Sequence, residues 1–595
     1  MRRTDHGTAV FGGVLNGWSA LLCFEMAYRG LGFLFLFPLL RHLLSLLPGL
    51  VGADYLGQDN LSLLARSPAA LLLLLAVLLL VGAYLCFEIA ALFLYAERGW
   101  RRERVTVWGL WREAAIGAAG LLRPRRLPVL LLLPAMALSG FALLSGYLRT
   151  VRVPEFVMEA VGADRGLLLL FLGTVGLCHL VLLLYLFGFP SLLLARRSFA
   201  GSWRESLALL RGRLLRTAGA LAGSLLLFAL AMAALAGAGV LGLALAARLL
   251  YPAGAARGQF QLWFLSLRGV WRVAAGPLWS AALCSAIVVL YHRARGEARP
   301  AAERRSRSLR RAALRVGGVL GTLALLLLFS ESEVGGRPLY PEEAVTQIVA
   351  HRAGAAFGPE NTVAALDRAV ADGAQLAEID VQQLGDGTLV VLHDTNFKRT
   401  TGLDLDVWDA DYETVRDLDA GAFFSPAFAG EPVPTLDGLL AAAKGRIGLM
   451  VELKSTGREQ DLVEATLALI HRRGMAGQCI IASMDMDLLR QVKALDPRMP
   501  TALTTVLLLS REYDLRDLDA YNVETASLSL GLVVQAHLQG KRVYAWTANS
   551  ASTMDKILRC RADGLVTDDP PLAAYCIEAA GRDPLLELLT EFLFD

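Results

Sequence analysis

Long apolar runs dominate the first 330 residues, whereas short apolar runs separated by polar stretches fill the rest of the chain. About 20 apolar residues in a helix are enough to cross the hydrocarbon core of a bilayer. A run from Trp18 to Leu47 carries four charged or titratable residues, so part of it can lie along the interface. The cleaner runs are Leu71–Tyr95, Leu127–Leu148, Gly166–Leu194, Ala218–Leu250, Val270–Tyr291 and the shorter Ala312–Phe329. This pattern predicts a helical membrane domain over residues 1–335 with about seven spans.

The second half predicts strands that alternate with amphipathic helices. The expected strands are Gln347–His351, Leu376–Val381, Leu389–His393, Ile447–Leu453, Cys479–Ser483, Thr501–Thr504, Val523–Ser527, Arg542–Trp546 and Gly564–Thr567. Such alternation is typical of a parallel α/β architecture, and its length and strand count favour a (β/α)₈ barrel over residues 340–580. Nine candidates for eight strands mean that one belongs to a hairpin or an insertion, and the second and third are too close for an intervening helix. Residues 403–435 are expected to form a small insertion without a clear element.

Charge divides the chain at the same place. Residues 1–330 hold 35 arginines, no lysine and 14 acidic residues, whereas residues 331–595 hold 23 basic and 41 acidic residues. The arginines gather in segments 98–126, 196–216 and 293–315, and the loops between these segments are poor in arginine or balanced. The positive-inside rule therefore places the N-terminus in the cytoplasm and residues 331–595 outside.

The composition fits a multi-pass protein of a bacterial plasma (inner) membrane. Membrane lipids are the expected surroundings of the first half. No nucleic-acid partner is expected, because the basic clusters follow the spans and no nucleic-acid module is recognisable. The oligomeric state is left open.

A tetrapeptide, Leu-Cys-Phe-Glu, occurs twice within the apolar runs and ends at Glu25 and at Glu88. Carboxylates inside a membrane are functional candidates by default. The structural alternative is that Glu25 pairs with Arg29 one helical turn later and that Glu88 is protonated within the bundle.

Polar side chains occupy the ends of several expected strands, where (β/α)₈ barrels carry their chemistry. Glu378 and Asp380 lie two residues apart on one strand, so their side chains share a face, and Glu452 ends another strand. Three carboxylates at one rim suit one hard divalent cation, Ca²⁺ or Mg²⁺. The alternative is that these carboxylates form structural ion pairs with Arg352 and Lys454.

Two histidines, His351 and His393, end the first and third expected strands. Histidine titrates near neutral pH, which makes the two a candidate general acid and base, although either alone could be a hydrogen-bonded core residue. Arg352 and Lys454 are cations beside the expected cation site, and this combination indicates an anionic substrate, phosphate above all. Trp546 ends a late strand and is a further candidate for substrate contact.

Short motifs follow one another in order along residues 345–575. They are Ala350–Gly354 (AHRAG), Pro359–Thr362 (PENT), Ala377–Val381 (AEIDV), Val391–Asp394 (VLHD), Arg399–Gly402 (RTTG), Val451–Lys454 (VELK), Trp546–Asn549 (WTAN) and Asp563–Asp568 (DGLVTD). With these motifs the chain closely resembles the glycerophosphodiester phosphodiesterases. Its first half is similar to the N-terminal membrane domain that is fused to some members.

The resemblance implies a (β/α)₈ barrel and hydrolysis of glycerophosphodiesters to sn-glycerol 3-phosphate and an alcohol. It assigns Glu378, Asp380 and Glu452 to the cation, His351 and His393 to acid/base catalysis, Arg352 and Lys454 to the phosphate, and Glu360 to the edge of the site. The family usually has glycine directly after His-Arg, whereas Ala353 stands here and Gly354 follows. Alanine adopts a positive φ only at a cost, so the loop beneath the phosphate is expected to have a different shape.

Two questions remain open from the sequence. The expected first strand begins at Gln347, soon after the last apolar run ends at Phe329, so the site is tethered close to the bilayer. This favours lipid headgroups, lysophospholipids or polyglycerol-phosphate polymers over free small diesters. A second hypothesis is a membrane transporter, scaffold or receptor whose barrel binds glycerophosphodiesters without cleaving them.

Overall fold

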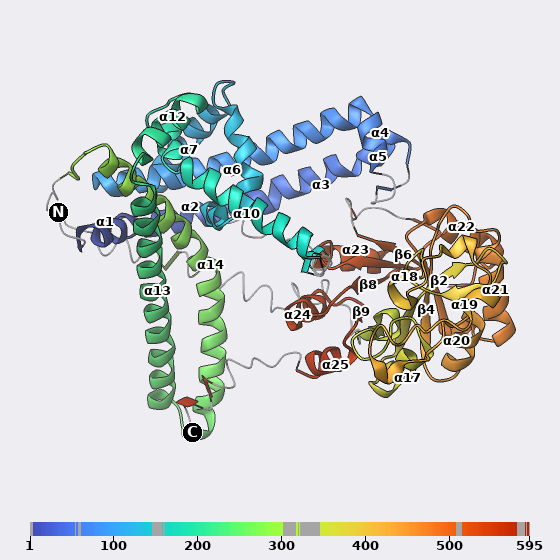
Figure 1. Cartoon of the computed structure of the whole chain (residues 1–595). Coiled ribbons are helices and arrows are strands. Elements are labelled where there is room, and N and C mark those ends of the chain that lie inside the picture. The colour runs from blue at the N-terminus through green and yellow to red at the C-terminus, as the bar shows by residue number, and fades with distance from the viewer. Residues whose placement is uncertain are drawn as a thin grey trace.

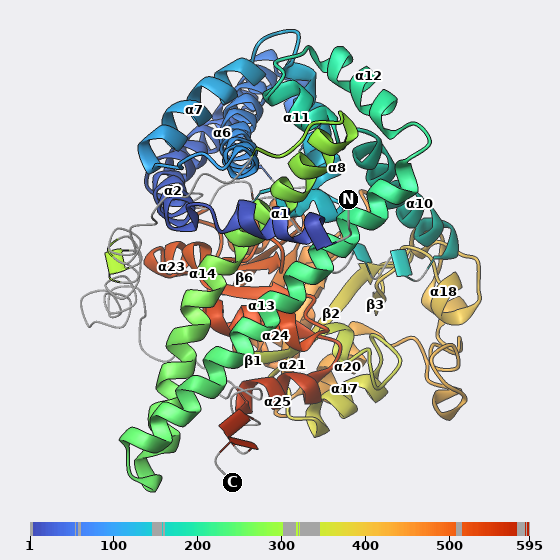
Figure 2. The same ribbon diagram turned by 90° about the vertical axis from the view of Figure 1, so that its left-hand side faces the viewer.

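The computed structural model of the chain describes residues 4–53, 55–56, 61–145, 164–300, 346–506 and 515–579, with a few isolated residues between and after these ranges. Helices fill the described part before residue 300, and a sheet surrounded by helices follows from residue 346 (Figure 1). The sheet and its helices lie beside the helical region in Figure 1 and behind part of it in the turned view of Figure 2.

Five helices in the described residues are long and apolar enough to cross a membrane: Trp18–Val51, Pro68–Arg101, Arg165–Leu184, Leu214–Leu250 and Ala274–Ala294. The first is built from α2 (Trp18–Leu31), η1 (Gly32–Leu36), α3 (Phe37–Ser45) and α4 (Leu47–Val51), and the others are α6 (Pro68–Arg101), α10 (Arg165–Leu184), α13 (Leu214–Leu250) and the second half of α14 (Ala253–Ala294). Leucines such as Leu72 and Leu169 are exposed on these helices. Exposed leucines in such numbers are expected of a surface that faces lipid.

Shorter helices precede or connect the long ones. They are α1 (Thr4–Val14), α5 (Ser62–Arg66), α7 (Val107–Leu121), α11 (Gly188–Leu193) and α12 (Phe199–Leu210). The expected span Leu127–Leu148 differs from the structure, which has three short pieces there, η2 (Leu127–Leu132), α8 (Leu133–Ala137) and η3 (Gly140–Leu144). Pro128 and Pro134 each stand near the start of a new piece, because proline lacks the N–H that would continue the preceding helix. The expected span Ala312–Phe329 lies almost entirely outside the described residues.

The two intramembrane glutamates are buried side chains with partners inside the helical region. The Glu25 carboxylate accepts a hydrogen bond from Arg29 Nε at 3.4 Å, one turn along α2. The Glu88 carboxylate accepts a hydrogen bond from the Ser145 hydroxyl. These partners support the structural interpretation of both carboxylates.

Eight parallel strands close into a barrel. They are β1 (Gln347–Ala350), β2 (Leu376–Gln383), β4 (Gly448–Leu453), β5 (Cys479–Ser483), β6 (Thr501–Thr505), β7 (Ala520–Glu524), β8 (Arg542–Trp546) and β9 (Gly564–Thr567). Strand β1 pairs with both β2 and β9, which closes the circle. The predicted (β/α)₈ barrel is therefore confirmed. The ninth strand, β3 (Leu389–Val391), pairs antiparallel with the end of β2 and forms the expected hairpin.

Helices surround the barrel in the expected alternation. They are α17 (Val363–Ala371), α20 (Leu436–Ala443), α21 (Leu462–Arg473), α22 (Met486–Leu495), α23 (Leu530–Leu538), α24 (Ala551–Cys560) and α25 (Pro570–Glu578). A large apolar core lies between strands and helices, and a smaller one, which includes Met450 and Tyr544, fills the inside of the barrel. A Cβ atom on Gly564 would lie 2.1 Å from the Tyr544 ring, so glycine is needed there to let this ring fill the interior.

Two segments differ in detail from the expectation. Strand β7 begins three residues earlier than predicted, and Thr525–Ser527 lie in the turn after it. The insertion contains only short elements, η6 (Val407–Asp409), α19 (Tyr412–Val415) and η7 (Pro426–Phe428), after α18 (Lys398–Thr401). It packs on β3 through a separate apolar cluster that includes Phe397.

Candidate functional site

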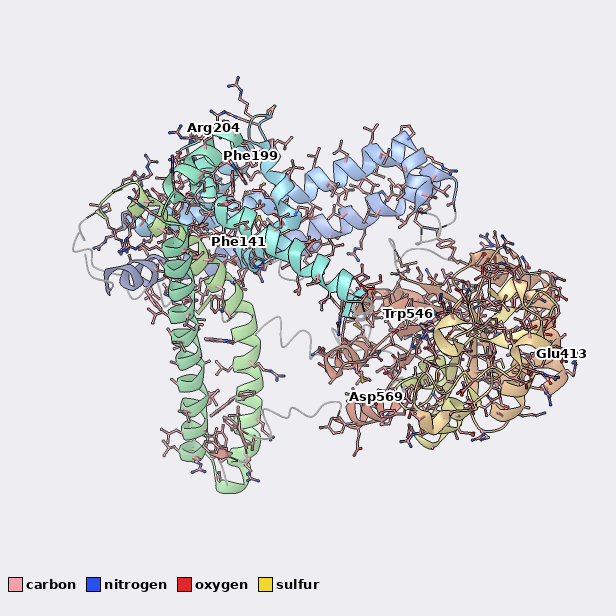
Figure 3. The ribbon with its side chains drawn as sticks, viewed as in Figure 1. Phe141, Phe199, Arg204, Glu413, Trp546 and Asp569 are labelled. Carbon is pink, nitrogen blue, oxygen red and sulfur yellow. The ribbon has the colours of Figure 1, made fainter. Side chains whose placement is uncertain are left out.

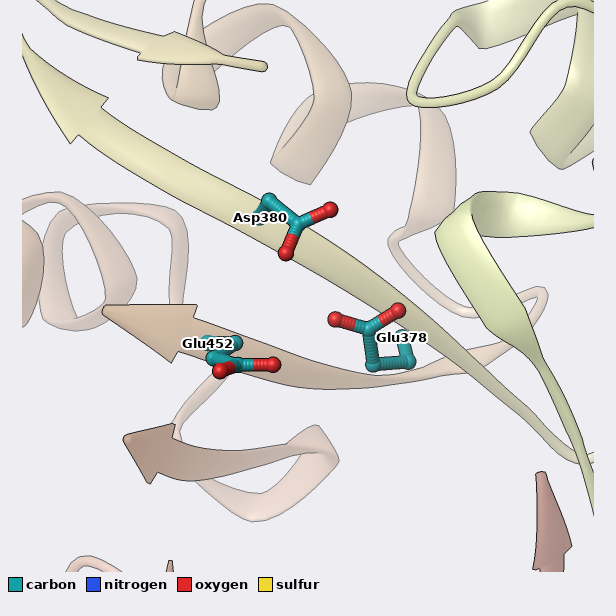
Figure 4. A group of neighbouring side chains, drawn as sticks. All are labelled: Glu378, Asp380 and Glu452. Atoms are coloured by element: carbon teal, nitrogen blue, oxygen red, sulfur yellow. The ribbon is translucent and has the colours of Figure 1, made fainter. Parts of the chain in front are cut away.

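Strands β2 and β4 bring three carboxylates together. Glu378 and Asp380 project from the same face of β2, and the parallel register places Glu452 of β4 directly beside Asp380. One oxygen of each carboxylate lies within 4.8 Å of an oxygen of the other two, and the residues are only 2%, 1% and 6% exposed. Figure 4 shows the three groups converging on one space from two neighbouring strands.

The protein satisfies most, but not all, of the oxygen atoms in this carboxylate trio. Glu378 Oε2 accepts the backbone N–H of Arg352 at 2.9 Å, whereas Glu378 Oε1 is buried and has no hydrogen-bond partner in the described part of the chain. Lys454 Nζ lies 2.8 Å from Asp380 Oδ1 and 3.1 Å from Glu452 Oε1. Three carboxyl groups thus face one lysine that contacts two of them, and Arg352 Nε lies 4.0 Å from Asp380 Oδ2. Leaving a buried oxygen without a partner is costly, so this orphaned oxygen fits a site whose donors hold a cation.

The charges in the trio are strongly coupled. Burial, reinforced by the neighbouring Asp380 carboxylate, raises the pKa of Glu378 to about 8. Burial also disfavours the charged form of Asp380, but the nearby cations Lys454 and Arg352, together with His393, outweigh it and hold the pKa of Asp380 well below its usual range. The carboxylates around Lys454 raise its pKa despite its burial. Hard oxygen donors with this charge balance fit Ca²⁺ or Mg²⁺.

His351 follows β1, the first strand of the barrel, and is held by an aspartate that follows β9, the last strand. Its Nδ1 lies 2.7 Å from Asp568 Oδ1, and Asp568 directly follows β9. Asn549 Nδ2 donates to the other oxygen, Asp568 Oδ2, at 2.6 Å. Burial would lower the pKa of His351, but the Asp568 carboxylate more than compensates and raises it. The pair orients the ring and leaves Nε2 for chemistry.

His393 reaches the site by a different route from the one that was expected. It does not end a barrel strand, because β3 runs antiparallel to β2 and brings the chain back to the level of Asp380, whose carbonyl accepts the Leu392 N–H at 2.9 Å. His393 Nδ1 lies 2.9 Å from Asp394 Oδ1. Arg399 Nε donates to Asp394 Oδ2 at 2.7 Å. These hydrogen bonds to His393 and Arg399 hold the pKa of Asp394 well below its usual range.

Glu360 lies between two arginines at the edge of the site. Arg399 donates to it through both terminal nitrogens, at 2.7 Å each, and Arg352 Nη1 donates at 2.9 Å. Burial opposes ionisation, but the two arginines lower the pKa of Glu360. Glu360 therefore links the loop of Arg352 to the segment that holds His393.

The loop after β1 has an unusual backbone. Arg352, Ala353 and Gly354 have φ values of 48°, 64° and 105°, so three residues in a row are left-handed. Ala353 is fully buried and adopts the positive φ that glycine would accept more readily. The Ala353 substitution therefore leaves the loop able to aim the Arg352 N–H at Glu378, at the expense of local strain.

Trp546 lies at the end of β8 and packs against the apolar layer inside the barrel (Figure 3). Its Nε1 donates to the Asn522 carbonyl at 3.1 Å. The ring is thus held by the barrel itself, and its contact with substrate stays a prediction.

Several residues that hold the site together were not singled out from the sequence. Asn361 Nδ2 donates to Asp380 Oδ2 at 2.8 Å, and Asn361 Oδ1 accepts the Asp380 N–H at 3.1 Å. Asp568, Asp394 and Arg399 anchor the two histidines. Asp568 follows a strand, so the strand-end rule would have found it, whereas the role of Arg399 depends on a tertiary contact.

Comparison with known proteins agrees with this geometry. Residues 351–572 match the glycerophosphoryl diester phosphodiesterase family, and residues 8–268 match the membrane domain of glycerophosphoryl diester phosphodiesterase. The glycerophosphodiester phosphodiesterase of Caldanaerobacter subterraneus subsp. tengcongensis is 31% identical over 245 residues, which cover 40% of this chain and 99% of that protein. The chain belongs to the glycerophosphodiester phosphodiesterase family. This phosphodiesterase is an enzyme anchored to a membrane by its first half, and the hypothesis of a non-catalytic binding protein is not supported.

Other relatives of this phosphodiesterase match its barrel half. A glycerophosphodiester phosphodiesterase of Bacillus subtilis is 27% identical over 278 residues, covering 42% of this chain and 93% of that protein. Among solved structures, a glycerophosphodiester phosphodiesterase from Agrobacterium tumefaciens is 28% identical and covers 39% of this chain and all of that one, with a TM-score of 0.36. An Oleispira antarctica phosphodiesterase in complex with the product sn-glycerol-3-phosphate is 26% identical and covers 39% and 97%, with a TM-score of 0.37.

Proposed function

We propose that this phosphodiesterase hydrolyses glycerophosphodiesters to sn-glycerol 3-phosphate and an alcohol at the outer face of the plasma membrane, with one divalent cation, Ca²⁺ or Mg²⁺. Glu378, Asp380 and Glu452 would hold the cation. The observation that carries the proposal is the convergence of these three buried carboxylates, in which Glu378 Oε1 has no hydrogen-bond partner among the residues that the structure describes.

The donor set fits the cation better than it fits a purely structural ion cluster. Lys454 offsets only part of the charge of the three carboxylates, and Arg352 is shared with Glu360. Oxygen-only donors favour Ca²⁺ or Mg²⁺ over zinc, which prefers nitrogen and sulfur. Once bound, the cation would polarise a phosphate oxygen and lower the pKa of the attacking hydroxyl.

The two histidines perform the proton transfers. Each is anchored through Nδ1 to an aspartate, His351 to Asp568 and His393 to Asp394, so Nε2 of each ring is the nitrogen that exchanges protons. One histidine removes the proton of the attacking hydroxyl, which belongs to water or to the substrate's own glycerol 2-hydroxyl. In the second case a cyclic phosphate forms, and water must then open it to give sn-glycerol 3-phosphate. The other protonates the leaving alkoxide. Both histidines have the same kind of aspartate partner, so the acid and the base must be assigned by kinetic measurements.

Phosphate contacts come from the cations beside the trio. Arg352 and Lys454 offset the negative charge that grows on the phosphoryl oxygens. Glu360 keeps Arg352 in place through a 2.9 Å hydrogen bond. Trp546, at the end of β8, is the residue that we expect to contact the substrate.

The side of the membrane on which the barrel lies is inferred from the position of one loop. Tyr55, between α4 and α5, is buried and belongs to the same apolar core as the barrel residues. This loop follows the first span, whereas the arginine-rich segments around α7 and α12 lie at the edge of the helical region away from the barrel (Figures 1 and 2). Together with the positive-inside rule, this arrangement supports an extracytoplasmic barrel and a cytoplasmic N-terminus.

A barrel held so close to the bilayer favours lipid-derived substrates. We expect lysophospholipids, lipid headgroups or polyglycerol-phosphate polymers to be cleaved faster than free small diesters. The purified full-length protein is therefore assayed on a panel of lysolipids and soluble glycerophosphodiesters, with and without chelator. Chelator-sensitive release of glycerol phosphate supports the activity, and a clear preference for soluble diesters would remove the membrane-substrate part of the proposal.

The acid/base assignment has its own control. His393→Ala should reduce hydrolysis about 10²- to 10⁴-fold without loss of folding. His471→Ala is the matched control, because His471 is an exposed residue on α21 that pairs with Asp496 at 3.0 Å. Full turnover by His393→Ala would refute the assignment.

A further inference from the structure

Two loops that are far apart in sequence are tied together at one edge of the helical region. One loop, residues 122–126, follows α7, and the other, residues 194–198, precedes α12. Arg126 Nε donates to the Arg197 carbonyl at 2.9 Å, and another of its nitrogens donates to the Arg196 carbonyl. The Phe199 N–H donates to the Arg125 carbonyl at 2.9 Å. The backbones of the two loops are therefore held side by side.

This junction concentrates positive charge. We call Arg123, Arg125, Arg126, Arg196 and Arg197 the arginine cluster. Burial, followed by repulsion from Arg123 and Arg196, lowers the pKa of Arg126. Arg197 pairs with Glu205 at 2.8 Å, but the other four have no carboxylate within 4.0 Å among the residues that the structure describes. Arginines brought this close without acidic partners repel one another, so an anion bound between them would be stabilising.

The start of α12 adds to the positive potential. Helix α12 begins at Phe199, directly after the cluster, and the Ser198 hydroxyl caps it by accepting the Gly201 N–H at 3.2 Å. The first turn of a helix carries a partial positive charge and attracts anions. Arg123, Arg125 and Arg196 are exposed beside this helix start, whereas the side chain of Arg126 is half-buried.

The arginine cluster also lies where two apolar segments of the chain meet polar loops. The apolar segment that begins at Leu127 follows Arg126 immediately, and Leu131 within it is 79% exposed. The apolar run Gly166–Leu194 ends just before Arg196. A basic group that directly adjoins a lipid-facing apolar segment lies at the depth of the headgroup phosphates. Figure 3 shows Phe199 and Arg204 on α12 at the edge of the helical region remote from the barrel.

We propose that the arginine cluster binds the phosphate group of an anionic phospholipid headgroup, separately from the catalytic site. Guanidinium groups pair with phosphate oxygens through two parallel hydrogen bonds, so several arginines can surround one phosphate. The bound headgroup relieves the repulsion among the arginines and fixes the junction of the two loops in the membrane interface. A free phosphate ion would offer the same chemistry, and only the experiment separates the two sources.

The test compares two charge-matched triple variants of the full-length protein in detergent. Arg123→Gln/Arg125→Gln/Arg196→Gln removes the exposed part of the cluster and retains Arg126, which holds the loops. Arg104→Gln/Arg112→Gln/Arg204→Gln removes the same charge from exposed arginines outside the cluster. Binding of short-chain phosphatidylglycerol is measured by native mass spectrometry, with inorganic phosphate as competitor and short-chain phosphatidylcholine as the neutral lipid. Unchanged hydrolysis of a soluble diester shows that both variants are folded.

We expect phosphatidylglycerol to bind to the wild type and to the control at least about tenfold more tightly than to the cluster variant. Inorganic phosphate at millimolar concentration should not displace it. Equal loss in both variants would show a general surface-charge effect and overturn the proposal. Cluster-dependent binding of inorganic phosphate without binding of the lipid would overturn the headgroup assignment in favour of a free-anion site.

Discussion

Asp380 and Glu452 are direct neighbours in the parallel register of β2 and β4, and the ammonium group of Lys454 contacts a carboxylate oxygen of each. This relationship places two acidic groups side by side inside the mouth of the barrel. Glu378 lies two residues before Asp380, on the same face of β2. Like charges this close are held together only by what neutralises them. Lys454 and Arg352 supply part of the neutralisation, and a cation bound by the three carboxylates would supply more.

Asn361 should be needed for cation affinity although it is not itself a proposed ligand. Its amide bonds both the carboxylate and the N–H of Asp380. Asn361→Gly removes these bonds and still tolerates the φ of 60° at this position. We expect a roughly 10- to 100-fold loss of cation affinity, measured by calorimetry. Asn396→Gly, which removes a hydrogen bond to Asp406 in the insertion, should leave the affinity unchanged.

Asp568→Asn should impair the reaction through His351. The aspartate raises the pKa of this histidine, so its loss should lower that pKa and move the corresponding limb of the pH–rate profile to lower pH, whichever proton His351 transfers. The rate should fall about 10²-fold. The raised pKa also stabilises the fold below the unfolded value of about 6.5, and this contribution disappears as pH rises through the folded pKa. A pH–rate profile of Asp568→Asn whose limbs lie at the same pH as in the wild type would contradict the proposed role of Asp568.

Arg399 should act by holding Asp394, the partner of His393. Arg399→Gln removes the hydrogen bonds to Asp394 and Glu360 and should slow hydrolysis about tenfold, mainly in kcat. The adjacent Lys398→Gln is the control, since Lys398 is exposed and, among the described residues, its side chain forms an ion pair with Asp404 alone. If both variants lose activity equally, the loss reflects the insertion as a whole and not the positioning of His393.

The orientation of the barrel predicts where substrate must be supplied. Intact right-side-out vesicles should cleave an externally added, membrane-impermeant glycerophosphodiester at the same rate before and after permeabilisation. The diester is chosen from those that the purified protein cleaves. Activity that emerges only after permeabilisation would place the barrel in the cytoplasm and contradict the inference from Tyr55 and the arginine-rich loops.

The sequence predicts the barrel and its three carboxylates well because both depend on short-range pattern. A spacing of two puts Glu378 and Asp380 on one face of a strand, and the barrel topology then brings Glu452 beside them. The same rule, applied to Gly564–Thr567, would also have identified Asp568. The position of His393 could not be read this way, since it follows an antiparallel hairpin strand whose direction depends on pairing with β2.

Hydropathy was less informative where backbone chemistry decides the structure. The run Leu127–Leu148 is apolar enough for a span, but its prolines divide it into short helices. Likewise, the sequence singles out Ala353 in the loop after β1 but does not give the backbone there, which has three consecutive residues with positive φ. The network of Glu360, Arg399 and Asp394 joins segments 39 residues apart and has no local signature.

Direct titration of the purified, chelator-treated full-length protein with Ca²⁺ and with Mg²⁺ by calorimetry tests the central claim. The account predicts one cation per chain, with affinity reduced about 100-fold or more in Glu452→Gln. Glu413→Gln should bind as the wild type does, because Glu413 is an exposed carboxylate on the insertion that pairs with Arg416 (Figure 3). A wild type that binds neither ion, or a Glu452→Gln variant that binds as tightly as the wild type, would contradict the claim that the three carboxylates form a cation site.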